Sequence, residues 1–151
     1  MIEKLVYLYY TDGWERFSSQ GLNQFLYDCL QTVQSSIQPE LWDLLDDEWF
    51  HDAYMTDLTC AQSNGTYLLR LSIEKEVIES RKIVLEFSGV SLFQTNGNIL
   101  DMKVKFPHPC NKTPIAQILD IWVEKNDNLT CCILFDNARS LYMRCDRIKL
   151  L

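Results

Sequence analysis

Hydrophobic residues between positions 20 and 34 recur at the spacing of one helical face. Leu22, Phe25, Leu26, Cys29, Leu30 and Val33 fall at i, i+3, i+4, i+7, i+8 and i+11, which predicts an amphipathic helix. Pro39 suits the first turn of a second, short helix that continues through Leu45. Upstream, Lys4 to Tyr10 is aromatic and predicts a strand or an extended arm.

From Tyr54 the period of the pattern changes to two. Mostly apolar residues at every second position, 54 to 60 and 67 to 73, alternate with mostly polar ones, and Asn64-Gly65 lies between the two runs. An Asn-Gly pair in this position predicts a tight hairpin, because the primed turn needs positive φ at both central residues. A third strand is expected over 83–87, ending at Gly89. A second hairpin is expected at Asn96-Gly97, with an outgoing strand over 100–106.

The last third predicts a three-stranded meander over 119–123, 129–135 and 141–145. The apolar parity then shifts, which a bulge near Asp146-Arg147 would explain. We therefore expect an α+β fold in a single domain, 1–151, with a mainly helical part over 1–50 and an antiparallel β part over 51–151. In it, N-terminal helices pack on a mainly antiparallel sheet, or on a sandwich of hairpins and the C-terminal meander. No glycine-rich phosphate loop is present, so a nucleotide-binding βαβ fold is not indicated.

Charge is distributed unevenly along the chain. Residues 1–60 contain eleven acidic and two basic side chains, a net charge of −9, whereas the remainder carries +2. An acidic surface repels phosphate, which argues against nucleic acid as a partner. The same surface attracts basic proteins and speeds their encounter.

The six cysteines form no Cys-x-x-Cys pair and mostly occupy apolar positions. We expect six free thiols, most of them buried, and no zinc or redox site. The apolar run from Leu5 to Tyr10 is too short for a signal sequence, and no stretch reaches the length of a membrane span. These features predict a cytoplasmic protein that has no membrane partner, and no cofactor is indicated.

The segment from Glu40 to Trp49 is the candidate binding site. It places Asp43, Asp46, Asp47 and Glu48 around Trp42 and Trp49. Aromatic anchors beside a charged rim are typical of a protein interface. The alternative interpretation is structural: the two tryptophans fill the core, and the acidic residues form a solvated face.

His51-Asp52 admits two interpretations. A structural role would hold backbone groups where the helical part meets the sheet. A catalytic role would use both residues in a small metal-dependent hydrolase. That chemistry needs further ligands, and His108 is the one other histidine in the chain.

The stretch Trp49-Phe50-His51-Asp52-Ala53-Tyr54-Met55, with a later Phe135-Asp136-Asn137 turn, resembles small uncharacterised bacterial proteins in which a helical N-terminal part ends in a His-Asp-Ala strand leading an antiparallel sheet. Some of these are immunity proteins of polymorphic toxin systems. The resemblance implies a non-enzymatic protein that neutralises a basic toxin, and it supplies no catalytic residue. The metal-dependent hydrolase and a regulatory module remain the alternatives.

Overall fold

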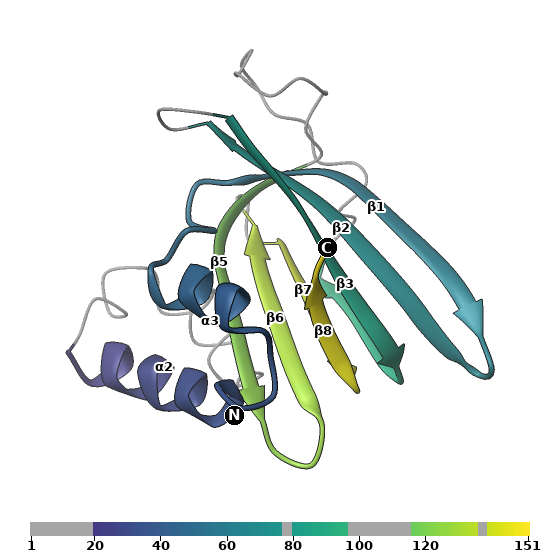
Figure 1. Ribbon diagram of the computed structural model, residues 1–151, viewed down its shortest axis with the longest axis horizontal. Helices are drawn as coiled ribbons and strands as arrows, with labels where there is room; N and C mark the ends of the chain where they lie inside the picture. Colours follow the sequence, from purple (N-terminus) through teal and green to yellow (C-terminus); the bar gives the residue numbers. More distant parts are fainter. Residues whose placement is uncertain (1–19, 77–79, 97–115, 136–138) are drawn as a thin grey trace.

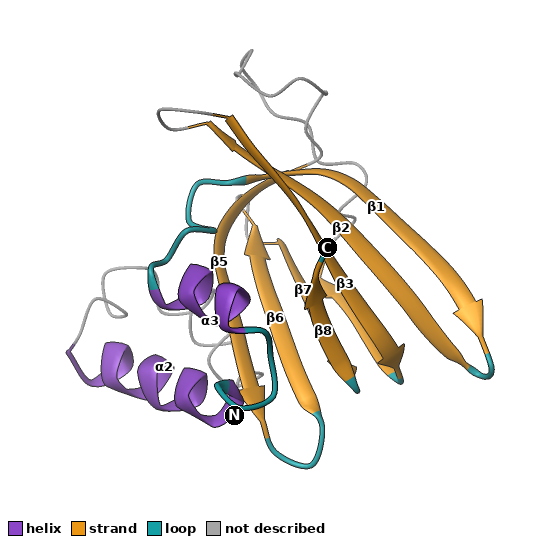
Figure 2. Cartoon of the chain, in the orientation of Figure 1, coloured by secondary structure: helices purple, strands orange, loops and turns teal. Residues whose placement is uncertain are grey.

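The computed structural model describes residues 20–76, 80–96, 116–135 and 139–151. In this part of the chain two helices precede eight strands (Figures 1 and 2). The elements are α2 (Gln20–Val33), α3 (Pro39–Asp46), β1 (Tyr54–Ser63), β2 (Thr66–Glu76), β3 (Ser80–Val90), β4 (Leu92–Asn96), β5 (Ala116–Lys125), β6 (Leu129–Phe135), β7 (Arg139–Cys145) and β8 (Arg147–Leu150). Neither described helix is long and apolar enough to cross a membrane.

All strand pairs in the described sheet are antiparallel, in the order β4-β7-β6-β5-β1-β2-β3-β8. Strands at opposite edges of this sheet are consecutive in the sequence. β3 continues into β4 after Ser91, and β7 continues into β8 after Asp146, so two long bent strands pair along both of their halves. The sheet therefore curls until its two edges meet at a corner.

Gly89 makes this corner possible. Its φ of +63° is a left-handed conformation that favours glycine. A Cβ atom placed there would lie 2.1 Å from Oδ2 of Asp146. The backbone N–H of Asp146 donates to the carbonyl of Ser88 at 3.0 Å, which holds the two bent strands together. The parity shift expected near Asp146-Arg147 is thus a change of pairing partner, from β6 and β4 to β3, with its irregularity at Asp146.

The helical part and the sheet share one hydrophobic core. Val33, Ile37, Leu41 and Leu44 are buried with the inward side chains of the strands, among them Phe87 and Phe135. A smaller cluster of Trp122, Cys132 and Leu134, with Leu26 packed on it, lies on the other face of β5 and β6. α2 lies beside β5 in Figure 1. Burial on both faces explains why residues 121–124 of β5 are buried without alternation.

The main sequence predictions hold in the described residues. The helix predicted up to Val33, the short helix beginning at Pro39, the strands predicted over 54–60, 67–73 and 83–87, and the C-terminal meander are all present. Asn64 and Gly65 have φ of 49° and 79°, as the predicted hairpin turn requires. The protein is thus mostly β with some helix, which agrees with an α+β fold at a coarse level. The predicted N-terminal strand, Gly97 and the strand over 100–106 lie outside the described residues.

The cysteine prediction is confirmed for five thiols. Cys29, Cys131, Cys132 and Cys145 are free and buried, and Cys60 is free and exposed. Burial raises the pKa of Cys132 and of Cys145 to about 12, so both thiols are unreactive. Cys110 lies outside the described residues.

Candidate functional site

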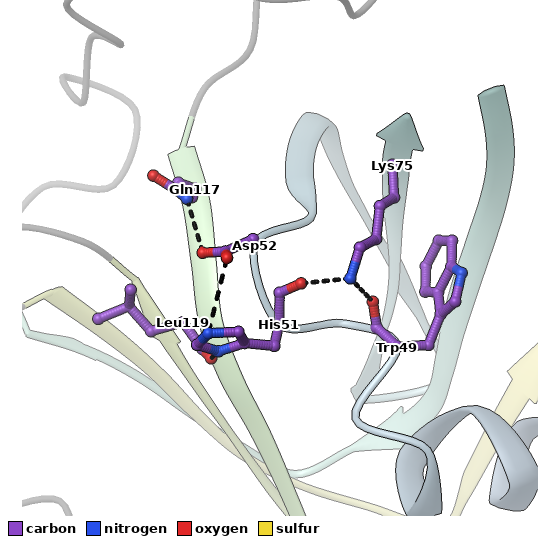
Figure 3. Close-up of polar contacts among 6 residues, drawn as sticks. All are labelled: Trp49, His51, Asp52, Lys75, Gln117 and Leu119. Atoms are coloured by element: carbon purple, nitrogen blue, oxygen red, sulfur yellow. Dashed lines mark hydrogen bonds and ion pairs between the residues drawn. The ribbon is translucent and has the colours of Figure 1, made fainter. Parts of the chain in front are cut away.

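The segment from Trp49 to Ala53 links α3 to β1, and its polar groups are bonded within the protein. The Lys75 ammonium, near the end of β2, donates to the carbonyl of Trp49 at 2.8 Å and to that of His51 at 2.5 Å (Figure 3). On the other side, the backbone N–H of Asp52 donates to the carbonyl of Ile118 at 3.0 Å. We call residues 49–53 the junction segment, since it is tied to both β2 and β5.

His51 and Asp52 take part in this attachment. Nδ1 of His51 lies 2.6 Å from the carbonyl oxygen of Leu119, and Nε2 lies 3.6 Å from Oδ2 of Asp52. The Asp52 carboxylate accepts a hydrogen bond from Nε2 of Gln117 at 2.9 Å (Figure 3). Asp52 adopts a φ of 62°, which Asp tolerates better than most residues. Both side chains are about half exposed, so their contacts with β5 lie at the protein surface.

The described polar contacts of His51 and Asp52 are all made within the protein. Among the residues that the structure describes, no group of three or more His, Cys, Asp and Glu side chains is arranged to hold a metal ion. Nδ1 of His51 is already directed at a carbonyl oxygen. His108 lies outside the described residues. A structural role for the pair remains the interpretation that we prefer.

The acidic side chains of α3 fall into two groups. Glu40, in the first turn, forms an ion pair with Arg81 at 2.8 Å. Asp43, Asp46, Asp47 and Glu48, at the end of the helix and just after it, are all exposed. We call these last four residues the acidic segment. Within the described part of the chain, no salt bridge involves any of them.

The two tryptophans of the candidate interface are both half-buried and packed against the core. Trp49 contacts Phe50 edge to face, with the ring centroids 5.2 Å apart. Lys75 and Arg81 lie 5.9 and 5.7 Å from the centroid of its ring. These cation–π contacts occupy the aromatic surface that a basic partner would use. The Trp49 ring would therefore have to lose its contacts with Lys75 and Arg81 before it could bind a cation of the partner.

A pocket of about 190 Å³ lies between α2, the acidic segment and β5. Its lining includes Leu26, Tyr27, Asp46, Glu48 and Asp120, together with the apolar residues Leu30, Leu45, Ile121 and Val123. The pocket lies along the edge of β5. Among the described residues, the ladder between β1 and β5 pairs only 54–55 with 116–117, which leaves residues 120–123 of that edge next to the pocket.

Asp120 is the electrostatically perturbed group of this pocket. Its pKa is raised from 3.8 to about 6, mainly by burial and to a smaller extent by the nearby charge of Glu48. The Trp122 side chain, the hydrogen bond from the Ile121 backbone and the charge of His51 act in the opposite direction. The Ile121 N–H donates to Oδ1 of Asp120 at 2.8 Å. A carboxyl group in a cleft with a strongly raised pKa is a recognised mark of a functional site.

Cys29 lies at the same pocket but is a poor nucleophile. Its thiol donates to Oε2 of the buried Glu124 across 3.7 Å. Burial, followed by the charge of Glu124, raises the thiol pKa to about 11. The thiolate is therefore scarce near neutral pH, which argues against thiol chemistry in the pocket.

The structure thus brings Asp46 and Glu48 together with a residue that the sequence did not single out, Asp120. Lys75 was likewise not predicted. One signal for Asp120 was present: Trp122 and Glu124 share its parity in β5. A tryptophan on the face opposite Leu119, Ile121 and Val123 indicates that another part of the chain covers that face.

Comparison with known proteins does not place the chain in a family. No protein-family model matches it, and no curated protein sequence shows significant similarity to it.

Proposed function

We propose that the chain is a non-enzymatic binding protein that recognises a basic protein through the acidic segment, Asp43, Asp46, Asp47 and Glu48. In its most specific form, the partner is a toxin such as a nuclease, whose phosphate-seeking surface the acidic segment covers. The observation that carries the proposal is the exposure of four carboxylates within six residues, none of them in a salt bridge within the described residues.

The position of these charges supports binding rather than stability. A helix carries partial negative charge at its C-terminus, so acidic side chains there are unfavourable. Asp43 and Asp46 lie toward the C-terminal end of α3, whose last turn holds no basic residue, and Asp47 is its C-cap. Glu40, by contrast, lies in the favourable first turn and has a cation, Arg81. The stability of the fold therefore does not explain the charges of Asp43, Asp46 and Asp47.

Affinity capture with two baits tests the proposal. The parent protein and a variant with Asp43→Asn, Asp46→Asn, Asp47→Asn and Glu48→Gln are immobilised, and proteins from the source organism are passed over both. We expect the parent to retain a basic protein that the fourfold variant loses, and salt to release it.

A control bait carries four matched neutralisations elsewhere on the exposed surface, among them Asp127→Asn on the β5–β6 turn. Retention of the same partner by the fourfold variant, with unchanged salt dependence, would contradict the proposal. Loss from the control bait to the same extent would mean that net charge matters and the location of the charges does not.

A further inference from the structure

We propose that the pocket between α2, the acidic segment and β5 receives one arginine side chain of the basic partner. This inference rests on the proposed function and names the contact at its centre. It moves that centre from Trp42 and Trp49, which pack against the core, to the pocket lined by Tyr27, Asp120 and Glu48.

The size of the pocket favours a single side chain. Sites for drug-sized ligands and cofactors usually measure about 300–1,000 Å³, and this pocket measures about 190 Å³. The space is nevertheless far larger than one water molecule requires, about 10–15 Å³. A long, narrow side chain inserted from a partner surface suits this volume.

The lining suits a guanidinium group on an aliphatic stem. Leu26, Leu30, Leu45, Ile121 and Val123 supply apolar walls, against which the methylene groups of arginine would pack. Asp46, Glu48 and Asp120 supply carboxylates from two different parts of the fold. No lysine or arginine occurs among the described residues that line the pocket.

Arginine fits this lining better than lysine. Its planar guanidinium binds carboxylates through two parallel hydrogen bonds and stacks on aromatic rings. Tyr27 is 51% exposed, which leaves its ring accessible at the pocket, and Trp122 contributes a second aromatic ring. Lysine offers a compact, strongly hydrated charge without the planar fork that binds a carboxylate through two parallel hydrogen bonds.

A second pocket in the described residues shows why charge complementarity points to the first. It measures about 210 Å³ and is lined by Glu74 and Lys82 together with Thr56 and Ser72. Because it holds charges of both signs, it offers no net attraction for a cation. The pocket beside α2 is similar in volume and purely acidic in its charged lining.

A titration without the partner tests this inference. N-acetyl-arginine amide is added to the ¹⁵N-labelled protein in the millimolar range, and the backbone amide signals are followed by NMR. We expect saturable shifts in residues 26–30, 45–48 and 120–123. N-acetyl-citrulline amide, which has nearly the same shape and no charge, should cause no saturable shift.

Variants make the test specific. Asp120→Asn should weaken arginine amide binding about fivefold, since one carboxylate of the site is lost. Asp127→Asn removes the same charge from an exposed turn and should leave the affinity unchanged. Equal shifts with the citrulline compound, or equal affinity in the Asp120→Asn variant, would overturn the inference.

The titration separates this inference from the proposed function. If arginine amide does not bind while the acidic segment still governs partner capture, the pocket proposal fails and the proposed function stands. If arginine amide binds the pocket but partner capture ignores the acidic segment, the proposed function fails, and the role of the pocket in it fails too.

Discussion

The junction segment and the acidic segment are neighbours in the chain but use their polar groups in opposite ways. In the junction segment, carbonyl oxygens, the His51 imidazole and the Asp52 carboxylate are bonded to Lys75, Gln117 and β5. In the acidic segment, the four carboxylates are exposed and form no salt bridge within the described residues. The difference teaches that a motif suggestive of catalysis, His51-Asp52, can be bonded into the fold while the carboxylates of the charge run beside it stay exposed.

Lys75→Met should have the largest effect on stability. It removes a cation that donates to two carbonyl oxygens of the junction segment, and hydrogen bonds to charged groups contribute about 1.5–3 kcal/mol. We expect the free energy of unfolding to fall by about 2–3 kcal/mol in urea denaturation. Lys149→Met, on β8, is the control and should cost less than about 0.5 kcal/mol. Equal losses in the two variants would contradict a special role for Lys75.

Asp120 is influenced by both segments, through the charges of Glu48 and His51, and should give a pH-dependent effect. Its pKa is raised from 3.8 to about 6, so the folded state holds a proton that the unfolded state has lost between these values. Stability should therefore fall as pH rises from about 4 to about 6, by on the order of 2 kcal/mol.

Asp120→Asn should remove this loss. At pH 8 the variant should be more stable than the parent by on the order of 2 kcal/mol, and near pH 3.5 the two should be equally stable. Thermal or urea denaturation at both pH values measures the difference, with Asp127→Asn as the matched control. A destabilised Asp120→Asn at pH 8 would mean that the carboxylate serves the fold.

His51→Ala should have a smaller effect than Lys75→Met. The imidazole is about half exposed and makes one close contact, with the carbonyl of Leu119. We expect a loss of about 1 kcal/mol in the free energy of unfolding, within the usual range for one hydrogen bond. Binding of the basic partner should remain. Unchanged stability together with loss of an activity would instead favour a catalytic role for His51.

The fourfold neutral variant of the acidic segment should have the smallest effect on stability. Its side chains are exposed, and three of them are placed unfavourably for the dipole of α3. We expect the free energy of unfolding to change by no more than about 0.5 kcal/mol, or to rise slightly. A loss of 2 kcal/mol or more would show that these carboxylates stabilise the fold. It would contradict the proposed difference between the acidic segment and the junction segment.

Local patterns predicted most of the described elements, because periodicity reports which face of an element is buried. The helix ending at Val33, the Asn64-Gly65 turn and the C-terminal strands follow from such patterns. The closure at Gly89 could not be predicted in this way, since it depends on the approach of Asp146 from a distant strand.

The candidate site was predicted in part for the same reason. Asp46 and Glu48 stand out in the sequence as members of a charge run. Asp120 becomes part of a pocket only in the folded chain, where α2 and the end of α3 lie near it. Lys75 likewise meets Trp49 across 26 positions of sequence. Contacts of this separation leave no periodic signal.

The association rate with the captured partner is the most direct test of the account. It is measured at increasing ionic strength for the parent, the fourfold neutral variant and the control with four neutralisations elsewhere. We predict that the parent and the control associate quickly at low salt and slow steeply as salt rises, because charge steers the encounter. The fourfold variant should associate more slowly and depend weakly on salt. The same rate and the same salt dependence in the parent and the fourfold variant would contradict the account.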